Sequence, residues 1–144
     1  MALVPSIAAI GAALTHGLAE VDLPPIVSAY LFGSVARGTA HRESDVDLGV
    51  LFDYARSNAD TRFAACLRLA TRLAEVLHIG RVDVVVLNDA PPTLGRRIIT
   101  EGQRLTCLDA DADHAFVRDV QLRAADIAPF LARTRRVKLA AIAS

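Results

Sequence analysis

The chain has 144 residues, 53% of them apolar, which is the usual size of one domain with its own hydrophobic core. Sixteen Lys and Arg residues balance 16 Asp and Glu residues. A balanced charge excludes a global field that attracts nucleic acid or an anionic membrane, so we expect neither direct nucleic-acid binding nor membrane binding. We predict a single domain spanning residues 1–144.

The first 18 residues are apolar but do not resemble a secretory signal, because the first basic residue of the chain is Arg37. They are also too short to span a bilayer. Apolar side chains recur at helical spacing in Leu3, Ile7, Ile10, Leu14 and Leu18, which predicts an amphipathic helix packed on the domain, with Pro5 in its first turn. We therefore expect a cytoplasmic protein.

A short apolar run over residues 26–32 predicts the first strand, which ends at a turn formed by Gly33 and Ser34. Ser34 can cap a short helix that Gly38 ends. Residues 44–52 then predict a second strand. Because side chains alternate along a strand, Asp45, Asp47 and Gly49 are expected on one face of it.

Residues 59–78 predict a helix closed by Gly80. Its expected buried face consists of Phe63, Cys66, Leu67, Ala70, Leu73, Ala74 and Leu77, and its expected exposed face includes Arg62, Arg68, Arg72 and Glu75. Residues 81–87 predict a valine-rich strand, in which Asp83 faces away from Val82, Val84 and Val86. Cys66 and Cys107 lie far apart in apolar stretches, which favours buried free thiols.

A helix is expected from Pro91 and Pro92 to Gly102, followed by a strand over residues 104–108. Residues 111–143 predict one or two helices, with Pro129 as a break or kink and with Phe116, Val120, Ile127 and Leu131 in the core. The predicted fold is α/β (α+β), with a mixed sheet of about four strands, the carboxylates at one edge and helices packed on one face.

The segment around the first turn carries the chemistry. Gly33 permits close approach of a phosphate to the backbone, and Ser34 with the amides that follow favours an anion site. Asp45 and Asp47 project from the same face of a strand and would repel each other unless a cation lies between them. Mg²⁺ prefers carboxylate and phosphate oxygens, and two such ions can clamp an in-line displacement. Asp83 fits as the third carboxylate.

Each feature also has an ordinary structural interpretation. A Gly-Ser pair is a common turn, Ser44 with Asp45 is a common helix or turn cap, and a lone Asp-x-Asp is usually solvated surface. In combination the features meet the needs of one metal–phosphate site. The four histidines have no shared ligand spacing, so we expect no zinc site.

The pattern of Gly33-Ser34, ten intervening residues and Asp45-x-Asp47 resembles the GSx10DxD signature of DNA polymerase β-like nucleotidyltransferases. Residues 33–38, 44–48 and 82–88, with Ile98 through Glu101-Gly102, look like the short one-domain members of that superfamily. Among these, the sequence is similar to the MNT-domain antitoxins of HEPN/MNT toxin–antitoxin pairs over a core of residues 5–108, with helices at 111–143 outside the resemblance.

The resemblance implies an antitoxin that transfers AMP from ATP to a tyrosine of its partner HEPN ribonuclease toxin and forms a hetero-oligomer with it. It implies that Asp45, Asp47 and Asp83 are catalytic and bind two Mg²⁺ ions, and that Gly33 and Ser34 hold the triphosphate. Ser44 completes the expected nucleotide site with Arg37. Arg42 is a further candidate for a phosphate contact, although arginines in turns are commonly solvated.

Two other functions remain open from the sequence. The chain could neutralise a toxin by binding alone, with a vestigial site, although the intact Asp83 argues against this. It could also transfer a nucleotide to a small molecule such as an antibiotic, although little length is left for an acceptor domain. The basic cluster Arg133, Arg135, Arg136 and Lys138 fits either a solvated helix end or a patch that grips an acidic partner or RNA.

Overall fold

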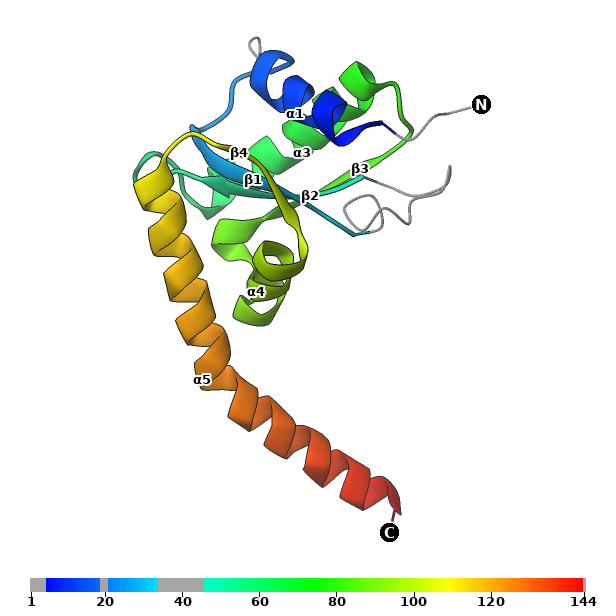
Figure 1. The fold of residues 1–144 in the computed structure, drawn as a ribbon, viewed down its shortest axis with the longest axis vertical. Coiled ribbons are helices and arrows are strands. Elements are labelled where there is room, and N and C mark those ends of the chain that lie inside the picture. The colour runs from blue at the N-terminus through cyan, green and yellow to red at the C-terminus, as the bar shows by residue number, and fades with distance from the viewer. Residues whose placement is uncertain (1–4, 19–20, 34–45, 144) are drawn as a thin grey trace.

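A four-stranded mixed sheet forms the centre of the computed structural model, which describes residues 5–18, 21–33 and 46–143 (Figure 1). The strands are β1 (Ile26–Phe32), β2 (Val46–Phe52), β3 (Val82–Val86) and β4 (Gln103–Cys107). Their order is β3-β2-β1-β4. β1 is antiparallel to β2 and β4, whereas β2 and β3 are parallel. The predicted mixed sheet is confirmed, with each strand within two residues of its expected bounds.

Helices cover both faces of this sheet rather than one (Figure 1). On one face lie α1 (Ile7–His16) and α3 (Ala59–Leu77), and on the other lie α4 (Pro92–Glu101) and the long α5 (Ala110–Ala143). Two short 3-10 helices, η1 (Tyr54–Arg56) and η2 (Leu87–Asp89), follow β2 and β3. The expectation of helices on one face is therefore corrected. The physical reason is that both faces of the inner strands carry apolar side chains, and each needs a covering layer.

Two buried clusters result from this arrangement. Between the sheet and the pair α1 and α3 lie Ile10, Leu14, Ala29, Leu31, Val46, Leu48, Val50, Phe52, Ala65, Leu69 and Leu73. Between the sheet and the pair α4 and α5 lie Val27, Tyr30, Leu51, Leu87, Ile98, Phe116 and Val120. Alternate residues of β2 point into the two clusters, as the period of two in a strand requires. Both layers therefore hold the strands that carry the predicted carboxylates.

The first helix agrees with its predicted apolar face over most of its length. Ile10 and Leu14 are buried, Leu18 packs against the core, and Ile7 is exposed. The helix begins after Ser6, whose hydroxyl accepts a hydrogen bond from the Ala9 amide. Pro5 thus precedes the helix, and Leu3 lies outside the described residues.

The buried face of α3 differs from the expected one. Its buried residues are Arg62, Ala65, Leu69 and Leu73, whereas Phe63 and Leu67 are 66% and 57% exposed. The apolar line of the helix runs through Ala65, Leu69 and Leu73. Arg62 extends this line toward Asp89, and its guanidinium binds both carboxylate oxygens, through Nε at 2.9 Å and Nη2 at 2.8 Å. A bidentate pair of this kind makes burial of an arginine tolerable. It also ties α3 to η2.

The last helix is anchored by a buried carboxylate that the sequence did not indicate. Asp113 is 1% exposed, and its Oδ1 accepts hydrogen bonds from the Ser28 hydroxyl at 2.6 Å and the Tyr30 hydroxyl at 2.7 Å. Its Oδ2 accepts a hydrogen bond from Nη1 of Arg104 at 3.1 Å. These contacts join α5 to β1 and β4 within the sheet. The first turns of α5 are therefore fixed to the domain.

The described part of α5 is one helix with Pro129 inside it, so the alternative of two helices is not realised. Phe116 and Val120 are buried as expected and Ile127 is half-buried, but Leu131 is 45% exposed. The core assignment of Leu131 is corrected, because α5 packs on α4 through its first half, and its second half extends away from α4 and the sheet (Figure 1). The described helices include none that is both long enough and apolar enough to cross a membrane.

Candidate active site

Three strand ends meet at one end of the sheet. β1 ends at Phe32, while β2 and β3 begin at Val46 and Val82. Because β1 runs against β2 and β2 runs with β3, the last residues of β1 lie beside the first residues of the other two. Phe32 is paired with Asp47, and Asp47 is paired with Asp83. We call this end, defined by Gly33, Asp47 and Asp83, the carboxylate end.

Asp47 and Asp83 lie side by side on this end. Residues paired in register point to the same side of a sheet, and neighbouring strands are about 4.8 Å apart. Both residues are half-buried, and the Asp83 side chain is 40% exposed. Two carboxylates at this spacing favour a cation between or beside them. Arg81 supplies one positive charge, since its Nε donates a hydrogen bond of 3.0 Å to Oδ1 of Asp83.

Gly33 brings the backbone close to the first of these carboxylates. Its φ angle is +78°, in the region that side chains other than glycine rarely adopt. A Cβ atom on Gly33 would also collide with Oδ2 of Asp47. Only glycine therefore permits the chain to leave β1 in this direction while the Asp47 carboxylate keeps its place. The predicted turn at Gly33 therefore has the backbone conformation that requires glycine, and the approach of a phosphate to it stays a prediction.

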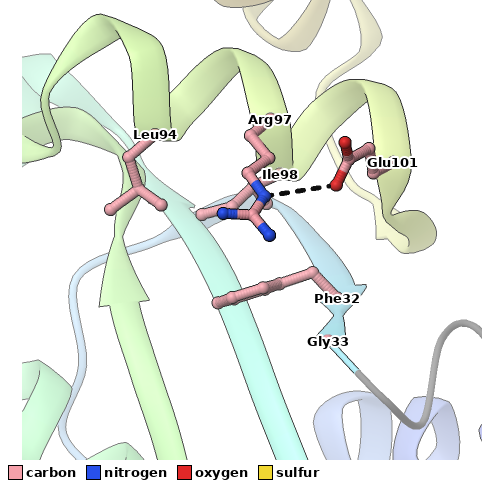
Figure 2. A pocket seen from close by; sticks show the side chains of 6 residues that line it. All are labelled: Phe32, Gly33, Leu94, Arg97, Ile98 and Glu101. Carbon is pink, nitrogen blue, oxygen red and sulfur yellow. Dashed lines mark hydrogen bonds and ion pairs between the residues drawn. The ribbon is translucent and has the colours of Figure 1, made fainter. Parts of the chain in front are cut away.

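A cavity of about 200 Å³ adjoins the carboxylate end (Figure 2). It lies between β1 and α4, and its lining residues are Phe32, Gly33, Leu94, Arg97, Ile98 and Glu101. Figure 2 shows the Phe32 ring below Arg97, whose Nε lies 3.2 Å from Oε2 of Glu101. The cavity thus has an apolar floor and a charged rim. Gly33 belongs both to this lining and to the carboxylate end.

Sequence reasoning did not assign the residues of α4 to a site. The lining residues of α4 are three or four positions apart in the sequence, which places them on one helical face: Leu94, Arg97, Ile98 and Glu101. That spacing could have indicated a shared face. It could not indicate that the face lies against Phe32, because this contact joins segments far apart in the sequence.

Of the predicted site residues, the structure brings together Gly33, Asp47 and Asp83. Ser34, Arg37, Ser44 and Asp45 lie outside the described residues, as does Arg42. Within the described part of the chain, no three His, Cys, Asp or Glu side chains are grouped so as to hold a metal ion. The two carboxylates that are described supply hard oxygen ligands on one face, which is the donor chemistry that suits Mg²⁺.

The cysteines, the described histidines and the basic cluster of residues 133–138 lie outside this site. Cys66 and Cys107 are free and half-buried, and burial raises the pKa of the Cys66 thiol. His16, His78 and His114 are exposed at separate positions, and His41 lies outside the described residues. The basic cluster of residues 133–138 is exposed on α5, remote in sequence from the carboxylate end.

Comparison with known proteins supports one family. The family model described as polymerase beta, nucleotidyltransferase matches residues 19–111. This range includes every described residue of the carboxylate end. The chain is also 33% identical, over 101 residues, to the protein adenylyltransferase MntA of Shewanella oneidensis, a match that covers 70% of this chain and 68% of that protein.

Solved structures share the whole architecture. A chain in a crystal structure of a toxin–antitoxin complex with AMP-PNP is 28% identical, with a TM-score of 0.67, and the match covers 93% of this chain and 98% of that one. A chain in a complex of tri-AMPylated Shewanella oneidensis HEPN toxin with MNT antitoxin is 23% identical, with a TM-score of 0.63 and coverage of 96% and 99%. The second likeness supports the fold alone.

Proposed function

The chain belongs to the polymerase beta nucleotidyltransferase family, and we propose that it is an antitoxin that transfers AMP from ATP to its partner HEPN-domain toxin. The transfer inactivates the toxin. We propose that a single minimal domain carries out the reaction in the cytoplasm, where ATP is available, and that the two proteins form a hetero-oligomer.

The observation that carries this proposal is the meeting of Gly33, Asp47 and Asp83 at one end of the sheet. Transfer of a nucleotidyl group needs carboxylates that position metal-bound phosphate, together with a backbone that the phosphates can approach closely. The carboxylate end offers both features, and the cavity beside it offers an apolar floor. The adenylyltransferase relative and the AMP-PNP complex make ATP the favoured nucleotide.

We assign the nucleotide site to Gly33, Ser34, Arg37 and Ser44, with the cavity between β1 and α4 as its continuation. Arg97 lies on the rim of this cavity, and its guanidinium can bind a phosphate or ribose oxygen by hydrogen bonds. Phe32 offers a flat apolar surface for the base. The Arg97–Glu101 pair is exposed on both sides, so exchanging it for a ligand contact costs little.

We further propose that Asp45, Asp47 and Asp83 hold two Mg²⁺ ions. The donor set fits, because Asp47 and Asp83 are adjacent carboxylates whose repulsion a divalent cation relieves. When bound, such ions neutralise the charge that develops on the phosphate oxygens and lower the pKa of the attacking hydroxyl. Arg81 holds Asp83 through one oxygen and thereby limits the orientations of this carboxylate.

In the proposed step, the hydroxyl oxygen of a toxin tyrosine attacks the α-phosphorus of ATP. The new bond joins that oxygen to the α-phosphorus, and the bond from the α-phosphorus to the bridging oxygen breaks, so that pyrophosphate leaves with the bonding electrons. Asp83 accepts the hydroxyl proton, since its side chain is partly exposed and lies on the outer strand β3. Gly33 has no side chain and so lets the phosphates approach the backbone closely.

The decisive test is the intact mass of the HEPN-domain protein encoded beside this chain, after incubation with the chain, ATP and Mg²⁺. We expect the mass of one or more adenylyl groups to be added with the native chain and none with the Asp45→Asn plus Asp47→Asn variant. An unchanged mass despite a tight complex would contradict catalysis and favour an antitoxin that acts by binding alone. Modification of an added small-molecule acceptor, with the protein unmodified, would favour the third alternative.

A further inference from the structure

The apolar face of α5 is covered in the first half of the helix and exposed in the second. Phe116, Val120 and Ala124 are at most 6% exposed, and the first two pack with Ile98 of α4. Further along, Phe130, Leu131, Val137 and Ile142 are 63%, 45%, 64% and 81% exposed. We call residues 127–143 the distal segment. Figure 1 shows that it continues past α4 and away from the sheet.

The two halves share one helical stripe. Residues three and four apart lie above one another on a helix, and the buried positions 116, 120 and 124 continue at this spacing through the apolar residues Ile127 and Leu131. Phe130 and Val137 flank the same line. The stripe that packs on α4 therefore runs on into the distal segment. Contiguous exposed apolar side chains of this kind mark a surface that another molecule covers.

The charge of the distal segment is one-sided. Residues 127–143 contain three arginines and one lysine, with no Asp or Glu, which gives a charge of +4. The preceding part of the helix, residues 110–126, contains four aspartates and two arginines, which gives −2. Arg133, Arg135 and Arg136 are exposed, and helical spacing places Arg133 beside Phe130 and Val137, Arg135 beside Leu131, and Arg136 on the opposite face. The whole chain has no net charge, so this concentration is local.

This charge decides between two kinds of partner. Two copies of the chain that paired through their distal segments would bring +4 against +4, which opposes association. A partner surface with an apolar groove and an acidic rim would bury the apolar stripe and pair with the basic side chains. Amphipathic helices commonly bind in grooves of this kind. Because the segment is helical before binding, little conformational entropy is lost on docking.

We propose that the distal segment is the docking arm that holds the partner toxin, in an apolar groove rimmed by Asp and Glu. This inference rests on the proposed function for the identity of the partner. It assigns binding of the partner to α5 and leaves the chemistry at the carboxylate end. Binding and catalysis are therefore separable by mutation.

The test uses the full chain and the purified HEPN-domain partner in titration calorimetry at low and high salt. One variant, Phe130→Asp with Val137→Asp, interrupts the stripe, and another, Arg133→Glu with Arg135→Glu, reverses the two charges beside it and brings the net charge of the segment from +4 to zero. Two matched controls lie on the first half of the same helix: Leu122→Asp, at a side chain that is 62% exposed, and Arg118→Glu. All six substituted positions are exposed, and melting temperatures check that the fold is retained.

We expect both distal variants to raise the Kd at least about ten-fold and the controls to change it less than about three-fold. Higher salt should weaken native binding and have little effect on the charge-reversed variant. AMP transfer at saturating partner should keep its kcat while the KM for the partner rises. This split distinguishes a docking role from a catalytic one.

Native affinity in both distal variants, with a native chain that binds and modifies the partner, would overturn the docking arm and leave the proposed function intact. Loss of binding to anionic vesicles or to RNA, with partner binding retained, would also overturn it and assign the segment to that ligand. If the native chain neither binds nor modifies the partner, the proposed function fails, and the docking arm fails with it.

Discussion

The hydroxyl of Tyr30 donates a 2.7 Å hydrogen bond to Oδ1 of Asp113, and both residues are at most 5% exposed. The pair joins β1, next to the strand that carries Asp47, to the first turns of α5. The carboxylate also receives hydrogen bonds from Ser28 and Arg104. Burial and the neighbouring carboxylate raise the pKa of the Tyr30 hydroxyl above its ordinary value. The position of α5 thus depends on one buried charge.

Replacement of this charge should destabilise the domain. In Asp113→Ala the Ser28 and Tyr30 hydroxyls lose their buried acceptor, and a cavity is left, so we expect the free energy of unfolding to fall by about 2 to 4 kcal/mol. Urea denaturation followed by circular dichroism measures this change. Asp111→Asn, at an exposed position of the same turn, is the control and should be nearly neutral. Equal stability of the two variants would contradict the anchoring role.

Stability should fall at alkaline pH partly through Tyr30. Its pKa in the folded state is raised above the ordinary value of 10.0, so the stability it contributes is present below pH 10 and is lost as the pH rises above that value. Tyr30→Phe should lower stability by about 1 kcal/mol at neutral pH and flatten the decline that begins at the ordinary pKa of 10.0 and continues above it. The urea midpoints of the native protein and of Tyr30→Phe, measured as a function of pH, test this prediction. Parallel pH curves for the two proteins would contradict it.

The proposed metal-binding carboxylates should be needed for activity and not for folding. We expect Asp47→Asn and Asp83→Asn each to lower the rate of AMP transfer at least about a thousand-fold. The melting temperature should stay the same or rise, because each change relieves repulsion between adjacent carboxylates. The matched control is again Asp111→Asn, with native activity. A drop in melting temperature that parallels the loss of activity would instead assign these residues a structural role.

Gly33 should tolerate no side chain. Gly33→Ala places a Cβ against Oδ2 of Asp47 and requires a φ angle of +78° from an alanine, so we expect about 1 to 3 kcal/mol of lost stability and a larger loss of AMP transfer. Gly80→Ala is the comparison, since a Cβ there would meet nothing within 4 Å. Native activity in Gly33→Ala would show that the Asp47 carboxylate can move without consequence.

The cavity beside β1 predicts that two adjacent arginines, Arg96 and Arg97, differ in their contribution to ATP binding. Arg97 lines the cavity, whereas Arg96 is exposed and is not part of its lining. If the nucleotide occupies this cavity, Arg97→Ala should raise the KM for ATP by roughly ten-fold while kcat changes less. Arg96→Ala should leave both constants near their native values. Steady-state kinetics with varied ATP provides the measurement, and equal effects of the two changes would place the nucleotide elsewhere.

The sequence by itself determined the strands, the order of the helices and the position of the carboxylates. Strand patterns have a period of two and turns need particular residues, so Gly33, Asp47 and Asp83 could be assigned from local spacing. Their register across β2 and β3 follows once the strands pair. Such features depend on residues close together in the chain.

Only the tertiary structure decided which faces are buried. Arg62 lies on the buried face of α3 and Phe63 does not, and the burial of Arg62 is tolerated because Asp89, 27 residues further on, binds the guanidinium. Asp113 is buried because Ser28, Tyr30 and Arg104 surround it, and Leu131 is exposed because the second half of α5 extends away from α4 (Figure 1). Helical periodicity identifies an apolar stripe, but the element that covers it, or an ion pair that outweighs it, comes from a distant part of the chain.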